Sequence, residues 1–321
     1  MIKFTIRHNK QSHPIYDYIV RNVGDYCEYN NDDFDVCLFG LDCHMMHESY
    51  PSMFSRVMND KKYLIYLEHF GCAERDYVGI DTAVFDSIIN NDNFCGFMTH
   101  IEDSREKLEQ WFDHPVFQFN VGVDNVSDKF LYDKMEKLPV KEDITLMFWG
   151  SWCDPYNSNF GGRGGHKVDE ICCRLMGEFD NVRLIVKSGR PLACERFGRT
   201  ERYANYVSHK ELCGLHMKSD IFMLPAEQVH ASTVPFAMSF GLPVLGNNKW
   251  GMSDYLTHGV DSLVYEDDQN YVEKSVAGIR ELILERDKLR DMSVESLKTQ
   301  RRKFSSDKHD LELYSILRKF V

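Results

Sequence analysis

The chain has 321 residues, of which 43% are hydrophobic and 27% are charged, and its formal net charge is −12. This length favours two domains, and this composition is typical of a soluble globular protein. No run of eighteen apolar residues occurs and the first residues hold no long apolar core. We therefore expect no transmembrane helix and no signal peptide. We place the protein in the cytoplasm. Peripheral attachment to a membrane is an alternative, as is the host cytoplasm if the protein is viral.

The ten cysteines include no CxxC pair, which indicates reduced core thiols in a reducing compartment. The soft-ligand cluster Cys43-His44-Met45-Met46-His47 matches no zinc spacing, so we predict no metal site. The acidic net charge argues weakly against non-specific nucleic-acid binding, although it leaves room for one local basic groove.

The first part of the chain alternates buried-strand patterns with helical patterns. Continuous apolar runs predict strands at 2–6, 34–40, 63–67, 94–99 and 116–122. Apolar residues at helical spacing predict helices at 13–23, 81–90 and 104–112. This alternation predicts a parallel sheet covered by helices.

The polar segment KLPVKED (137–143) separates this series from a second one, so we place a domain boundary between 140 and 141. The second series predicts strands at 144–150, 182–189, 221–224, 242–246 and 260–265. It predicts helices at 166–179, 232–241, 252–259 and across 270–303. Residues 304–321 form a last helix that we expect to pack back on the first domain. The fold class is α/β, with two Rossmann-like doubly wound domains facing a central cleft.

The segment NFGGRGGHK (159–167) lies between a predicted strand and a strong amphipathic helix. Its four glycines let the backbone approach a ligand, and Arg163 and Lys167 place two cations at a helix N-terminus. Two cations beside a positive helix end favour a shared anion, and a diphosphate suits that place. The loop is not a P-loop, because no GK[ST] follows. A flexible surface loop is the alternative.

The stretch LPAEQVHASTVPFAMSFGLPVLGN (224–247) places one carboxylate in a polar loop between two apolar strands. Glu227 follows the first strand, where it can accept hydrogen bonds from sugar hydroxyls. Ser232 and Thr233 are expected to cap the next helix. We expect His230, Ala231, Ser232 and Thr233 to face the donor. A solvated loop glutamate is the alternative.

Residues 219–265 resemble the nucleotide-sugar half of family 4 glycosyltransferases, which have the GT-B fold. A strand ending in Pro, a Glu-bearing loop, "FAMSFGLPV" and "HGVDSLVY" stand in the family's order. FNVGVDNVSDKF (119–130) is similar to the family's end of the first domain, and MFWG (147–150) with Lys167 to its opening of the second. The resemblance spans roughly residues 94–265.

The resemblance implies a glycosyltransferase that moves a hexosyl or pentosyl group from a nucleoside-diphosphate sugar, with a UDP-sugar expected as donor. It assigns residues 1–140 to the acceptor and 141–303 to the nucleotide sugar. Lys167 matches the lysine that holds the donor diphosphate, and Gly150, Gly164 and Gly165 belong to the same cradle. It also implies retention of anomeric configuration.

The chain departs from the family at three places. Ser151 stands where the family has an arginine, for which Arg163 is the expected substitute. Glu227 approximates the first glutamate of the family's pair but stands two positions early, where an ungapped alignment puts Val229. Phe236 occupies the place of the second glutamate, which holds the ribose.

His69 follows a first-domain strand, where the family often carries a cleft histidine, and a structural histidine is the alternative. No Asp-x-Asp follows a strand, so we expect cations rather than a metal to stabilise the leaving diphosphate. The acceptor is left open among a glycan, a lipid-linked sugar and, for a viral or phage enzyme, a modified base in DNA. The oligomeric state is left open too.

Two other functions compete. A non-catalytic GT-B-like protein that binds sugar nucleotides would explain Phe236. A sugar-phosphate epimerase or a phosphorylase would share the architecture, but the pyridoxal lysine motif of a phosphorylase is missing. Fold alone does not choose among these functions.

Overall fold

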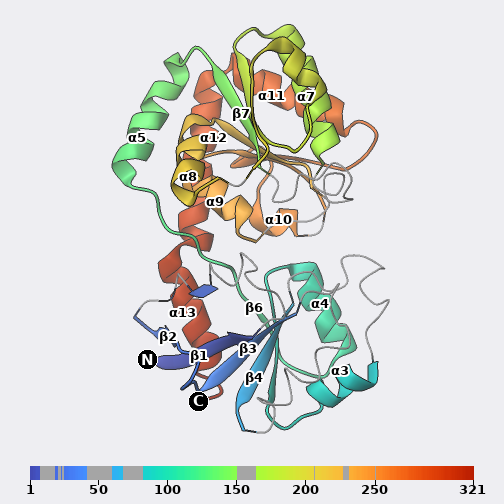
Figure 1. The fold of residues 1–321 in the computed structure, drawn as a ribbon, viewed down its shortest axis with the longest axis vertical. Helices are drawn as coiled ribbons and strands as arrows, with labels where there is room; N and C mark the ends of the chain where they lie inside the picture. Colours follow the sequence, from blue (N-terminus) through green and yellow to red (C-terminus); the bar gives the residue numbers. More distant parts are fainter. Residues whose placement is uncertain are drawn as a thin grey trace. The chain divides into compact units, whose positions relative to one another are not determined.

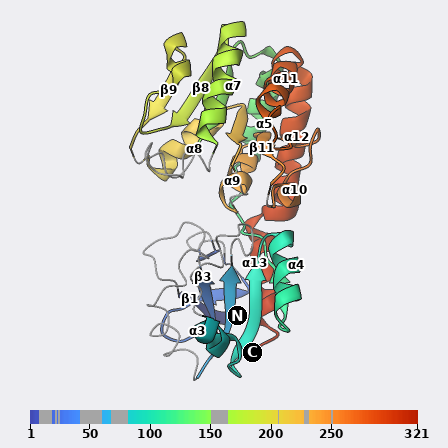
Figure 2. The same ribbon diagram turned by 90° about the vertical axis from the view of Figure 1, so that its right-hand side faces the viewer.

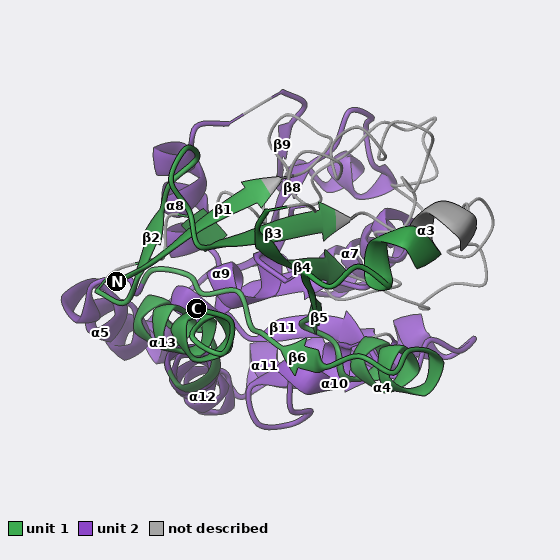
Figure 3. Ribbon diagram, turned by 90° about the horizontal axis from the view of Figure 1, so that it is seen from below, with its two compact units in different colours: residues 1–124, 302–321 green, residues 125–301 purple. Residues whose placement is uncertain are grey.

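The computed structural model describes residues 1–7, 19–20, 23, 25–41, 60–67, 82–149, 164–205, 207–226, 231–249 and 251–321. The chain folds into two compact units, which Figure 3 shows in different colours. Unit 1 comprises residues 1–124 and 302–321, and unit 2 comprises residues 125–301. The boundary that we predicted at 140 falls within unit 2, beyond its first helix.

Unit 1 is built on a six-stranded parallel sheet with the order β2-β1-β3-β4-β5-β6 (Figure 1). Its described elements are β1 (Ile2–Arg7), β2 (Cys27–Tyr29), β3 (Val36–Leu41), β4 (Lys62–Leu67), α3 (Thr82–Ile89), β5 (Phe94–Thr99), α4 (Glu102–Trp111), β6 (Val116–Gln118) and α13 (Ser306–Leu317). The strand order is that of flavodoxin-like doubly wound sheets.

Helices cover both faces of this sheet. On one face Phe39, Ile65 and Phe97 form a core with Leu108 of α4. On the other, the ring of His309 from α13 lies 4.8 Å from that of Phe119. These two layers make unit 1 a Rossmann-like unit.

Unit 2 holds a second six-stranded sheet, with the order β12-β11-β10-β7-β8-β9. Figure 2 shows several strands and helices of unit 2 from the side. The described elements of unit 2 are α5 (Asp128–Lys137), η3 (Leu138–Val140), β7 (Ile144–Phe148), α7 (Gly165–Glu178), β8 (Val182–Lys187), η4 (Ala193–Phe197), β9 (Thr200–Tyr203), α8 (His209–Lys218), β10 (Ile221–Leu224), α9 (Thr233–Ser239), β11 (Val244–Asn247), α10 (Met252–Tyr255), β12 (Ser262–Tyr265), α11 (Tyr271–Leu284) and α12 (Arg286–Phe304). The last of these helices, α12, runs past the boundary of the unit. Counted in chain order, these strands run 3-2-1-4-5-6, which is the order of dinucleotide-binding Rossmann sheets.

The side chains of β10 show how the two faces are filled. Ile221 and Met223 join the core under α7 and α11. Phe222 points to the other face, where its ring stacks on His216 of α8 at 5.8 Å. The predicted α/β fold class, with two doubly wound parallel sheets, is confirmed. Among the helices that the structure describes, none combines the length and apolar content that crossing a bilayer requires.

Candidate functional site

The candidate site lies at the carboxyl edge of the unit 2 sheet. All pairings in this sheet are parallel, so the carboxyl ends of its strands meet at one edge. The strand order reverses between β7 and β10, which is where ligands bind in open α/β sheets. We therefore expect the segments that follow these two strands to carry functional side chains.

Gly164 brings these two segments into contact. It is the N-cap of α7 and has a φ of 75°, a left-handed conformation that favours glycine. A Cβ at this position would overlap the carbonyl oxygen of Pro225, the residue after β10. Because nothing larger fits, the start of α7 packs directly on the end of β10. The first backbone N–H groups of α7, from Gly165 onward, have no partner inside the helix and carry its positive dipole end.

Lys167 lies in the first turn of α7, as the sequence predicts. Its Nζ forms an ion pair with Oδ1 of Asp267 and lies 5.0 Å from the ring centroid of Tyr271. The side chain is 19% exposed. A half-enclosed ammonium beside a helix N-terminus suits an anionic ligand.

Asp267 connects Lys167 to a second cation. Its Oδ2 lies 2.7 Å from Nζ of Lys249, which follows β11. Burial alone would raise the pKa of the Asp267 carboxyl, but hydrogen bonds from Lys167 and Lys249 outweigh it and hold that pKa below its usual value. The carboxylate is therefore ionised at neutral pH and shared by two ammonium groups.

The start of α9 differs from the prediction in one respect. Ala231 is buried, and α9 begins at Thr233 with Pro235 in its first turn. Ser232 is the N-cap, but its backbone is already in the right-handed helical region and its side chain makes no capping hydrogen bond. The predicted side-chain cap at Ser232 is therefore absent, because an N-cap side chain normally reaches the helix from an extended backbone.

Phe236 stands where the resemblance expects the ribose-binding glutamate. Its ring centroid lies 4.8 Å from that of His216 and 5.1 Å from that of Phe240. His209, at the start of α8, lies 5.6 Å away. The side chain belongs to an aromatic cluster between α8 and α9, so a ribose contact from this position would have to be apolar.

Six predicted site residues lie outside the described residues, namely Arg163, Glu227, His69, Gly150, Ser151 and His230. Of the others, the structure brings Gly164, Gly165 and Lys167 together at the start of α7, and Ala231, Ser232 and Thr233 at the start of α9. Within the described ranges, no three His, Cys, Asp or Glu side chains gather in a way that suits a metal ion.

Sequence reasoning missed Lys249 and Asp267. Each follows a predicted strand, at 242–246 and 260–265, and that position was the available signal. Nothing in the sequence shows that the two strands are neighbours, which is what lets Lys249 and Asp267 meet.

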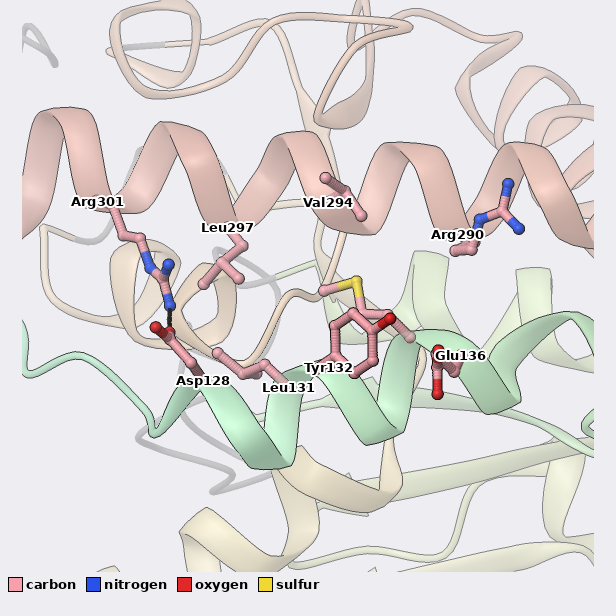
Figure 4. A pocket seen from close by; sticks show the side chains of 9 residues that line it. Asp128, Leu131, Tyr132, Glu136, Arg290, Val294, Leu297 and Arg301 are labelled. Carbon is pink, nitrogen blue, oxygen red and sulfur yellow. Dashed lines mark hydrogen bonds and ion pairs between the residues drawn. The ribbon is translucent and has the colours of Figure 1, made fainter.

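A groove of about 710 Å³ lies between α5 and α12, away from the residues described above (Figure 4). Leu131, Val294 and Leu297 contribute its apolar surface, and an ion pair between Arg301 and Asp128 stands at one end (Figure 4). None of the predicted site residues that the structure describes lines it, so its size does not make it the candidate site.

Several solved structures have a fold similar to that of this chain. HepE of Anabaena, in complex with UDP and glucose, matches with a TM-score of 0.70 and 11% identity over 99% of both chains. The pneumococcal O-GlcNAc transferase GtfA, in complex with UDP and GlcNAc, matches with a TM-score of 0.67 and 10% identity. TarM, known from S. aureus, matches with a TM-score of 0.63 and 13% identity.

The chain spans only part of two of these proteins. The match covers 95% of this chain and 59% of GtfA, and 87% of this chain and 54% of TarM. No protein-family model matches the sequence, and no curated protein matches it either. At these identities the similarity concerns the fold: the chain has the GT-B fold that HepE, GtfA and TarM share.

Proposed function

We propose that this protein is a glycosyltransferase that moves a sugar from a nucleoside-diphosphate donor to an acceptor hydroxyl. The observation that carries the proposal is Lys167 in the first turn of α7, at the switch point of a Rossmann-ordered sheet. HepE and GtfA, which share the fold, are described with UDP and a sugar. A UDP-sugar is therefore the donor we propose, with hexosyl or pentosyl transfer left open.

The chemistry of this site is electrostatic. Transfer breaks the bond between the anomeric carbon of the donor sugar and a diphosphate oxygen, and the acceptor oxygen takes the place of the diphosphate. Negative charge develops on the leaving diphosphate, where Lys167 and the first backbone N–H groups of α7 can stabilise it. We propose Arg163 as a further cation there, with Gly150, Ser151, Gly164 and Gly165 lining the cradle. In the site that we propose, these cations rather than a metal neutralise the leaving group, and anomeric configuration is retained, as in family 4.

The sugar side of the site rests on the loop between β10 and α9. We propose that Glu227 accepts hydrogen bonds from the donor sugar and that His230, Ala231, Ser232 and Thr233 face it. His69 is proposed to contact the sugar or the acceptor. The acceptor class stays among a glycan, a lipid-linked sugar and a modified nucleic-acid base. The cytoplasm is the compartment that we propose.

A second function is supported by Phe236. Phe236 itself supplies no carboxylate at the expected ribose position, and its described neighbours His216 and Phe240 are rings. A protein that binds sugar nucleotides without turning them over fits that observation. Binding with no release of nucleoside diphosphate from the donor would favour this second function.

The variant Lys167→Ala tests the proposal. We expect it to lower release of UDP from UDP-glucose or UDP-GlcNAc by about 10²- to 10³-fold, because one electrostatic contact to the leaving group is lost. Circular dichroism should show an unchanged fold, since Lys167 lies outside the apolar core. Lys298→Ala, which removes a 65% exposed side chain on α12, is the control and should keep full turnover. Near-normal turnover in Lys167→Ala would contradict the assignment.

A further inference from the structure

Two lysines from separate parts of unit 2 meet on one carboxylate. Lys167 binds Oδ1 of Asp267, and Lys249 binds Oδ2 at 2.7 Å. Their side chains are 19% and 39% exposed, whereas Asp267 is 13% exposed. Two ammonium groups share one carboxylate beside the positive end of α7, so the three side chains together carry one net positive charge. This group of three residues therefore keeps a net attraction for a further anion.

The chain fixes Lys249 in this position through its neighbours. The backbone N–H of Asn248 donates to the carbonyl of Tyr265 at 2.7 Å, and its side-chain amide donates to Glu266 at 2.7 Å. The carbonyl of Lys249 accepts a hydrogen bond from the N–H of Met252 at 3.2 Å. The segment after β11 is thus tied to the segment after β12, and the ammonium of Lys249 is held at the carboxyl edge of the sheet.

A buried amide ends β11, two residues before Lys249. Asn247, the last residue of β11, is fully buried, and neither polar atom of its side chain has a hydrogen-bond partner among the described residues. It lies on the same face of the sheet as Leu245, which belongs to the core under α7 and α11. Its ladder partner is Tyr265, which leads directly to Asp267. A buried polar group normally has a partner, so the unpartnered amide at this strand end indicates a place for a small polar group.

We infer that Lys249 is a second ligand of the donor diphosphate, acting together with Lys167, and that Asp267 is an internal counter-ion that the diphosphate displaces. The inference rests on the proposed function. A diphosphate carries more than one negative charge, so it can pair with two ammonium groups at once. A single carboxylate has one charge to share between them, and it loses its hydration when it is buried there. Lys249 thereby supplies a second positive charge at a site where Ser151 replaces the expected arginine.

Calorimetric titration of the full chain with UDP tests the role of Lys249. Lys249→Gln is expected to weaken UDP binding by about 10- to 100-fold, as loss of a charge-assisted hydrogen bond does, and to leave binding of uridine unchanged. Lys274→Gln is the matched control. Lys274 is 41% exposed and pairs with the neighbouring Asp268 at 2.8 Å, so this variant should bind UDP within about twofold of wild type.

The results distinguish the role of Lys249 from the proposed function. UDP affinity in Lys249→Gln equal to that of wild type would overturn the role of Lys249 and leave the proposed function standing. Failure of the wild-type protein to bind any nucleoside diphosphate would instead contradict the proposed function.

Inorganic pyrophosphate tests the role of Asp267 without a nucleoside. Asp267→Asn removes the competing anion, so it is expected to bind pyrophosphate about fivefold more tightly than wild type. Weaker binding by this variant would contradict displacement of Asp267 by the diphosphate.

Discussion

Gly164 shows at the scale of one residue why the glycine-rich segment is built as it is. Two requirements meet there: a φ of 75° and the close approach of the Pro225 carbonyl. The sequence predicts glycines near a ligand but does not indicate which of them is required. The structure singles out Gly164, since a side chain there would separate α7 from the end of β10.

The variant Gly164→Ala is expected to destabilise the protein by about 3 kcal/mol or more. About 1–2 kcal/mol comes from the left-handed conformation, and the overlap with Pro225 adds to it. Gly198→Ala is the control, because Gly198 has a φ of 68° but no described residue within 4 Å of its added Cβ. Urea unfolding of both variants measures the difference. Equal losses of stability would show that Pro225 does not restrict position 164.

Lys167, Lys249 and Asp267 mark the limit of sequence reasoning at this scale. Lys167 was found because it stands within a local pattern, a glycine-rich segment followed by an amphipathic helix. Lys249 and Asp267 belong to segments 18 residues apart that meet only because β11 pairs with β12. Such a non-local contact leaves no trace in local periodicity.

At the scale of secondary structure, Lys134 joins three helices. It lies on α5, and its Nζ donates to the carbonyl of Phe240 at 3.1 Å and to that of His216 at 3.5 Å. These carbonyls belong to the last turn of α8 and the C-cap of α9, and that of His216 also accepts the N–H of Ser219 at 3.2 Å. Burial lowers the pKa of Lys134 to about 7; the nearby Asp220 opposes this shift and Lys141 adds to it.

Stability should therefore depend on pH through Lys134. An unfolded lysine has a pKa near 10.4, so between pH 7 and 10 the unfolded chain binds more protons than the native one. The free energy of unfolding is expected to rise across this window by up to about 4 kcal/mol in wild type and to lose that rise in Lys134→Met. Lys137→Met, on an exposed position of the same helix, is the control. Parallel pH profiles for wild type and Lys134→Met, from urea unfolding, would refute the assignment.

The predicted elements agree best with the structure where the apolar pattern is long or the element is fully buried. The strands at 94–99 and 221–224 match β5 and β10, and the helix at 166–179 matches α7 within one residue. The short edge strands β2 and β9 were not predicted. In β9 the residues are only partly buried or exposed, so the apolar run that identifies a buried strand is absent. The helix α5 was missed as well, because it exposes Phe130 and Tyr132 and so lacks a clean apolar stripe.

At the scale of the whole molecule, two sheets of six parallel strands make up the two units. The alternation of strand and helix patterns was sufficient to predict this class, because parallel strands need crossovers and the crossovers are helices. The order of the strands was not predictable, because a buried parallel strand has the same apolar sequence pattern at any interior position of a sheet. The order 3-2-1-4-5-6 of unit 2 matters most for function, because it puts the switch point beside Gly164 and Pro225.

Ligand-dependent thermal unfolding measures whether a nucleoside diphosphate binds at the start of α7. Wild type and Lys167→Ala are heated with UDP, GDP, dTDP, ADP and CMP and with their common sugar conjugates. One nucleoside diphosphate at a hundred times its dissociation constant is expected to stabilise wild type by about 2.7 kcal/mol, a rise in Tm of roughly 4–8 °C. The rise should be much smaller in Lys167→Ala. A wild-type Tm that none of these ligands moves would contradict a nucleoside-diphosphate site at the start of α7.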